Sequence, residues 1–91
     1  MHRYLEWPEK LSGERLDYTI DMSSRLEAEE YIQSVTWKCG SPLVLESQRQ
    51  DVALLTAVLS GGEPGRRHAV EVLATTSQGR MVGERVMLLV G

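Results

Sequence analysis

Residues 69–90 read AVEVLATT, then SQGR, then MVGERVMLLV, and this stretch decides the fold. Side chains on a strand alternate between its two faces, so the apolar positions 70, 72 and 74 share one face. Positions 86, 88 and 90 do the same on the second run. Gly79 permits a tight turn between the two runs. A hairpin of this kind cannot be stable alone and must pack on a second layer, so the stretch predicts a small all-β domain.

Length and composition set limits on the class of protein. Ninety-one residues make one domain with a thin core. The formal charge of −3, with basic residues spread along the chain, argues against a nucleic-acid partner. No apolar run approaches the roughly 20 residues that span a membrane, and the first residues lack the apolar core of a signal peptide. We therefore expect a soluble protein that is made in the cytoplasm and has no membrane partner.

Residues with catalytic or metal-binding chemistry are few and scattered. Cys39 is the single cysteine, so no intrachain disulfide is possible, and we expect a buried thiol. His2 and His68 have no further ligand at metal-site spacing. The glycines of residues 61–65 lack the Lys-Ser/Thr of a phosphate-binding loop, which favours a plain turn. Ser60 lacks the setting of a nucleophile elbow. The sequence therefore predicts no cofactor, no metal and no enzyme.

The N-terminal residues 1–14 are predicted to form an extended arm, and residues 15–91 the β-sandwich domain. Pro8 and Gly13 punctuate the arm, which shows no periodicity. Tyr4 and Trp7 are its aromatic residues, and exposed aromatics on a tail must dock somewhere. Two interpretations are open: the pair packs on its own domain, or it docks on a neighbouring subunit.

Alternation of apolar and polar residues predicts further strands before residue 61. The predicted strands cover residues 15–22, 34–39, 43–46 and 51–60, with a polar turn at 47–50. Trp37 is expected to anchor the core between two sheets. Residues 23–32 fit either a short helical turn with a Ser24–Glu27 capping box or an irregular crossover.

Two strands carry apolar side chains on both faces. On residues 51–60 the second face holds Leu54 and Val58, and on the last strand it holds Met87 and Leu89. Burial of such a face by a partner protein is one interpretation. The alternative for residues 52–59 is a central strand or two helical turns.

The order of several short motifs resembles a known family. The motifs are WPEK at 7–10, LDYTIDMS at 16–23, IQSVTW at 32–37, LSGG at 59–62 and the TT, GR and ER pairs that follow. Together they resemble the fiber-tail adaptors, a family of small virion proteins of tailed bacteriophages. The resemblance implies an immunoglobulin-like β-sandwich with no catalytic group.

The resemblance also implies a structural role in the tail or neck of the virion. The protein would form a symmetric ring and join the tail tube or portal-proximal nozzle to the tail fibers through protein–protein contacts. We expect three contact surfaces: the arm, the apolar second face, and the loop tips at 61–65 and 77–80. The partner-contact candidates are Tyr4, Trp7, Pro8, Leu54, Val58, Arg80, Met87 and Leu89.

Other functions stay open at this point. A head decoration or head–tail completion protein could use the same fold with a different covered surface. A non-viral soluble binding module would need a concave aromatic patch, for which this chain has few aromatics. An enzyme would need a pocket of perturbed titratable groups.

Overall fold

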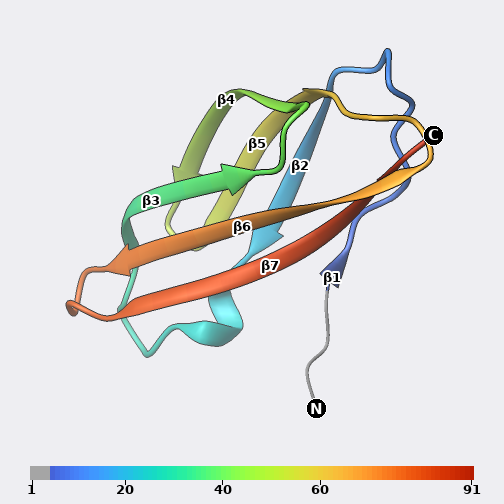
Figure 1. Cartoon of the computed structure of the whole chain (residues 1–91). Helices are drawn as coiled ribbons and strands as arrows, with labels where there is room; N and C mark the ends of the chain where they lie inside the picture. Colours follow the sequence, from blue (N-terminus) through green and yellow to red (C-terminus); the bar gives the residue numbers. More distant parts are fainter. Residues whose placement is uncertain (1–4) are drawn as a thin grey trace.

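The computed structural model describes residues 5–91 and shows two β-sheets packed face to face (Figure 1). One sheet has four strands in the order β1-β7-β6-β3, and the other has three in the order β2-β5-β4. The strands are β1 (Leu5–Glu6), β2 (Leu16–Asp21), β3 (Ile32–Cys39), β4 (Leu43–Asp51), β5 (Leu54–Gly61), β6 (Arg66–Thr76) and β7 (Met81–Val90). A single 3-10 turn, η1 (Ser23–Arg25), lies between β2 and β3. The predicted all-β class is confirmed.

The long hairpin predicted from residues 69–90 is present as β6 and β7. Its register pairs Val70 with Val86 and Ala74 with Val82, and all four of these side chains are buried. The turn passes through Gly79 at a φ of 80°, where a side chain would strain the backbone. Strand alternation therefore placed the hairpin and its inner face correctly.

The core lies between the two sheets in two adjoining clusters. The four-stranded sheet contributes Val72 and Val86 to one cluster, which meet Ile20 and Leu55 of the other sheet. Trp37 is half-buried and packs against both clusters, so it links them along the sandwich.

The predicted turn at residues 47–50 is wrong. These residues continue β4 to Asp51, and the turn falls at residues 52–53. The strand lies at the edge of its sheet, where both faces of residues 46–51 are exposed. Polar composition there reflects water on both faces, and a register shift between Leu45 and Ser47 further disturbs the alternation.

The crossover between β2 and β3 contains one 3-10 turn rather than a capped helix. The Ser24–Glu27 capping box does not form, because Met22 holds the N-cap position without a side-chain bond. Asp21 ends β2 instead: its Oδ1 accepts a hydrogen bond from the Ser23 N–H at 2.9 Å.

The N-terminal segment lies against the sandwich from residue 5 onward. β1 runs parallel to β7, pairing Leu5 with Val86 and Glu6 with Met87 (Figure 1). A parallel bridge follows between Lys10 and Val90. Residues 5–12 therefore lie along the β7 edge, with β1 as the fourth strand of the sheet, whereas residues 1–4, including Tyr4, lie outside the described part of the chain.

Candidate partner-binding surfaces

Backbone hydrogen bonds hold residues 5–12, here called the N-terminal segment, along β7. The Trp7 N–H donates to the Met87 carbonyl at 3.1 Å, and the Lys10 N–H donates to the Leu89 carbonyl at 3.0 Å. Two further bonds involve Gly91: its N–H donates to the Lys10 carbonyl, and its carbonyl accepts from the Ser12 N–H. The segment thus covers the C-terminal half of an edge that would otherwise offer unpaired backbone groups.

Trp7 connects this segment to the opposite sheet. Its ring stacks on Tyr18 with centroids 4.7 Å apart, and its Nε1 donates to the Thr19 carbonyl at 3.1 Å. Both partners belong to β2, whereas the Trp7 backbone is bonded to β7. Of the two interpretations of this aromatic, packing on its own domain is the one seen; a contact between Trp7 and a partner stays a prediction.

Lys10 is fully buried and fastens the end of the N-terminal segment. Its Nζ donates to the Gly61 carbonyl at 2.7 Å and the Leu11 carbonyl at 2.8 Å, with a longer contact to Ser12. Carbonyl oxygens therefore replace the water that an ammonium normally needs. Sequence reasoning missed this residue, because nothing in the local pattern distinguishes it from a solvated lysine.

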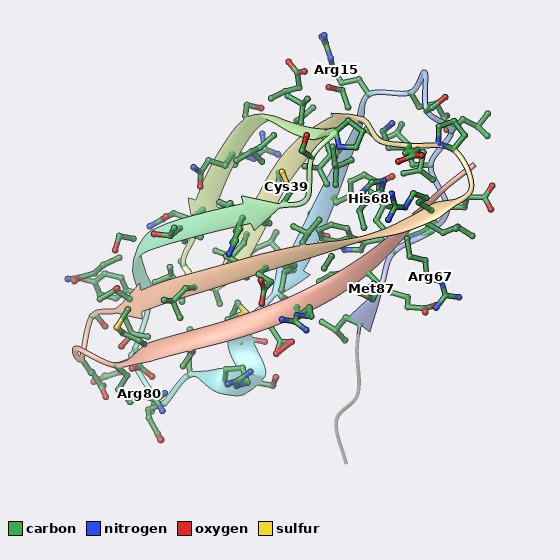
Figure 2. The ribbon with its side chains drawn as sticks, viewed as in Figure 1. Arg15, Cys39, Arg67, His68, Arg80 and Met87 are labelled. Carbon is green, nitrogen blue, oxygen red and sulfur yellow. The ribbon has the colours of Figure 1, made fainter. Side chains whose placement is uncertain are left out.

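A groove opens between the N-terminal segment and the outer face of the four-stranded sheet. Its lining residues are Glu6, Trp7, Glu9, Arg67, Met87 and Leu89. Met87 and Leu89 are half-buried, and Arg67 Nη1 lies 3.3 Å from Glu6 Oε1 beside them. Figure 2 shows Arg67 and Met87 next to each other near β1. The structure thus brings Trp7, Met87 and Leu89 together, with exposed Pro8 adjacent in the chain.

Leu54 and Val58 lie on the opposite side of the molecule. They belong to β5 in the three-stranded sheet, on the face away from the core side chains Leu55, Ala57 and Leu59. The prediction of one apolar second face shared with Met87 and Leu89 is therefore wrong: the side chains form two surfaces on opposite faces. Local alternation could not show this, because it does not reveal which sheet a strand joins.

Aspartates border the apolar stripe on β5. The strand register places Leu54 between Asp21 of β2 and Asp51 of β4, and Val58 opposite Asp17. Side chains of directly opposed residues share a face, and all three carboxylates are exposed. Hydrogen bonds from Ser23 lower the pKa of Asp21 and so favour its ionised carboxylate. We call Asp17, Asp21, Asp51, Leu54 and Val58 the acidic face.

Arg80 lies at the far end of the sandwich from Arg67 and Met87 (Figure 2), where it is tied to Glu30. Its Nε and Nη2 donate to the two Glu30 carboxylate oxygens at 3.0 and 2.6 Å. The Thr76 hydroxyl donates to the same carboxylate at 2.5 Å. These bonds, from Arg80 first and Thr76 second, lower the pKa of Glu30 from its ordinary 4.5 to about 2, although burial opposes the shift.

This ion pair gives both of its members a role in the fold. The Glu30 side chain is completely buried and joins the segment before β3 to the β6–β7 turn. Arg80 has a structural role, and a partner contact through its exposed remainder stays a prediction. The two partners are 50 positions apart in the chain, which explains why no local signal could have found the pair.

The glycine-rich loop at residues 61–65 is a turn. A Cβ on Gly62 would lie 2.6 Å from a methyl group of Val90, and its φ is 97°, so only glycine fits. The buried imidazole of His68 closes the loop, its Nε2 accepting the Glu63 N–H at 3.0 Å. Gly62 and His68 therefore both have structural roles in this loop.

Within residues 5–91, no group of three or more metal-ligating side chains comes together. No helix in this part of the chain is long and apolar enough to cross a membrane. The fold and its surfaces thus define a small all-β protein whose prominent features are two outward-facing apolar surfaces.

Comparison with known families identifies the chain more closely. Residues 10–89 match the family described as podophage GP4 fiber-tail adaptor protein gp77. Since the match covers most of the 91 residues, the chain belongs to this family of phage tail adaptors, as its sequence motifs indicated. A search of curated proteins found no significant match.

Proposed function

We propose that this protein joins the tail tube or the portal-proximal nozzle of a phage particle to its tail fibers through protein–protein contacts, without catalysis. One observation carries the proposal: the two apolar surfaces lie on opposite faces of one rigid sandwich. An adaptor must hold two partners at once at a fixed separation. The groove beside β7 and the acidic face over β5 meet this requirement.

The proposal extends to fold type and assembly. We infer an immunoglobulin-like sandwich, which the neighbour orders β7-β6-β3 and β2-β5-β4 support. We also infer that copies associate in a ring within the virion. Light scattering of the full-length chain tests the ring directly: a single mass equal to the monomer at high concentration would mean that any ring needs a partner template.

Particle composition tests the adaptor role. Leu54→Glu and Met87→Glu would each place a charge in one surface, in a phage supplied with the variant in place of its own copy. We expect one variant to fail to enter particles and the other to enter particles that lack fibers. Leu73→Glu is the matched control, because Leu73 is 46% exposed and Leu54 43% exposed, yet Leu73 lies outside both surfaces.

Virions are purified and their proteins quantified by mass spectrometry. If both surface variants, with folding confirmed by circular dichroism, gave particles with normal adaptor and fiber content, the bridging role would be wrong.

A further inference from the structure

The carboxylates of the acidic face are not neutralised by ion pairs within residues 5–91. None of Asp17, Asp21 and Asp51 forms an ion pair with another residue in the 5–91 range. Arg49, opposite Thr56, is the only basic residue in the paired rows that cross this face. The outer face of the other sheet is different, because Arg67 pairs with Glu6 at 3.3 Å and Arg85 with Glu71 at 2.7 Å. Like charges gathered around exposed apolar side chains are therefore particular to the three-stranded sheet.

The geometry around Leu54 is specific. Leu54 is 43% exposed and has one aspartate directly opposite it on each neighbouring strand. Adjacent strands lie about 4.8 Å apart, so Asp21 and Asp51 stand roughly 10 Å from each other with the leucine between them. This spacing suits a complementary surface with an apolar group flanked by two cations.

We propose that the acidic face binds a segment of another virion protein that places an apolar side chain on Leu54 and a basic side chain on each of Asp21 and Asp51. The inference rests on the proposed adaptor function and names the chemistry of one of its two partners. Complementary charges at such a surface steer encounter and fix orientation.

A second copy of this chain fits the acidic face less well. Most of the described surface cations already form ion pairs within the chain, and Lys38 and Arg49 are the exceptions. Lys10 is buried and cannot reach a neighbour. Residues 5–91 of a copy would therefore bring few free cations, whereas a basic partner segment would bring them directly.

The turn beside Leu54 supports an apolar contact here. Val52 has a φ of 54° and is 65% exposed, an unfavourable conformation for a β-branched residue. Two hydrogen bonds hold this turn: Ile32 N–H to the Val52 carbonyl at 2.8 Å, and Met22 N–H to the Ala53 carbonyl at 2.9 Å. The fold thus holds an exposed apolar side chain in strained backbone next to the proposed contact.

Two peptides provide the probe: acetyl-Lys-Ser-Leu-Ser-Lys-amide and the matched acetyl-Glu-Ser-Leu-Ser-Glu-amide. Each is titrated into the full-length ¹⁵N-labelled protein, and amide chemical shifts are followed. We expect the basic peptide to shift the amides of Asp21, Asp51 and Leu54 in a saturable, salt-sensitive way, and the acidic peptide to have little effect. Asp21→Asn with Asp51→Asn should weaken binding by about fivefold or more, consistent with two partly exposed charge pairs. Asparagine keeps the acceptor for the Ser23 N–H, and Glu71→Gln on the other face is the control.

Several results would overturn the inference. These are equal binding of the two peptides, shifts centred on the groove, or shifts at the acidic face that depend on protein concentration without peptide, which would identify a second copy as the occupant. The double asparagine variant is also tested in particles. Normal particle composition with this variant, together with defects in Leu54→Glu and Met87→Glu, would refute the charge recognition and leave the adaptor function standing. Normal particles with all three variants would refute both.

Discussion

Tyr18 is a buried residue that stabilises the fold through its ring and not through its hydroxyl. The ring stacks under Trp7, while the hydroxyl has no hydrogen-bond partner among the residues that the structure describes. Burial, with a smaller effect from Glu14, raises the pKa of Tyr18 and so further disfavours ionisation of the unpaired hydroxyl. A buried hydroxyl without a partner costs about 1–3 kcal/mol.

Replacement of Tyr18 by phenylalanine should therefore not destabilise the domain. We expect Tyr18→Phe to leave the free energy of unfolding unchanged or to raise it by up to about 1 kcal/mol, measured by urea denaturation. Tyr18→Ala is the contrast and should lower it by about 3 kcal/mol, because the stacked ring is lost. A loss of 1 kcal/mol or more in Tyr18→Phe would point to a partner for the hydroxyl.

Lys10 gives the second prediction at this scale. Lys10→Met keeps most of the aliphatic stem but leaves the Gly61 and Leu11 carbonyls without their donor. We expect the free energy of unfolding to fall by about 2 kcal/mol. Lys38→Met, at an exposed position, should change it little. Equal stability of the two variants would mean that the buried ammonium does not stabilise the fold.

At the scale of elements, the Glu30–Arg80 pair links the crossover before β3 to the β6–β7 turn. The pKa of Glu30 is lowered to about 2, so this carboxylate favours the folded state when it is ionised. Its contribution is complete above the ordinary pKa of 4.5 and is lost as the pH falls toward 2. Acid should therefore loosen this end of the sandwich.

Denaturation at several pH values tests this expectation. The free energy of unfolding of the natural chain should decrease between pH 4.5 and pH 2, and Glu30→Gln should be less stable at neutral pH and less dependent on pH in that range. Glu29→Gln, its exposed neighbour, is the control and should follow the natural chain. An unchanged pH profile in Glu30→Gln would contradict the assignment.

Sequence reasoning succeeded at the element scale where one face of a strand is wet and the other dry. β2, β6 and β7 show this alternation, and their buried positions were predicted correctly. The prediction of a turn at residues 47–50 failed because an edge strand that is exposed to water on both faces, like this part of β4, has the polar composition of a turn. Lys10 and Glu30 were missed because their partners, Gly61 and Arg80, are each at least 50 residues away in the chain.

For the whole molecule, the N-terminal segment closes one side of the sandwich. It is bonded to β7 through its backbone and to β2 through the ring of Trp7. The segment predicted as a docking arm therefore contributes to the stability of the domain from residue 5 onward. Its outer side lines the groove, so it can serve the fold and a partner together.

Removal of residues 1–12 should destabilise the domain. The deletion exposes Tyr18 and the edge of β7, and we expect the melting temperature to fall by about 10 °C or more. Leu73→Ala, at an exposed position of β6, is the control. A truncated chain that melts at the original temperature would mean that the segment is a free arm. The deletion also uncovers the edge of β7, and an uncovered strand edge can pair with another copy. An oligomer of the truncated chain is therefore not evidence for ring assembly.

The burial of Lys10 has a practical consequence for locating the protein in a particle. The sequence holds two lysines, Lys10 and Lys38. With Lys10 enclosed, Lys38 is the one side-chain amine among residues 5–91 that a cross-linking reagent can reach. Lys38 lies opposite Glu71 in the strand register, on the outer face of the four-stranded sheet and away from the acidic face. Cross-links from this amine in intact virions would therefore identify the protein that faces the four-stranded sheet. They would also reveal how each copy is oriented in the particle.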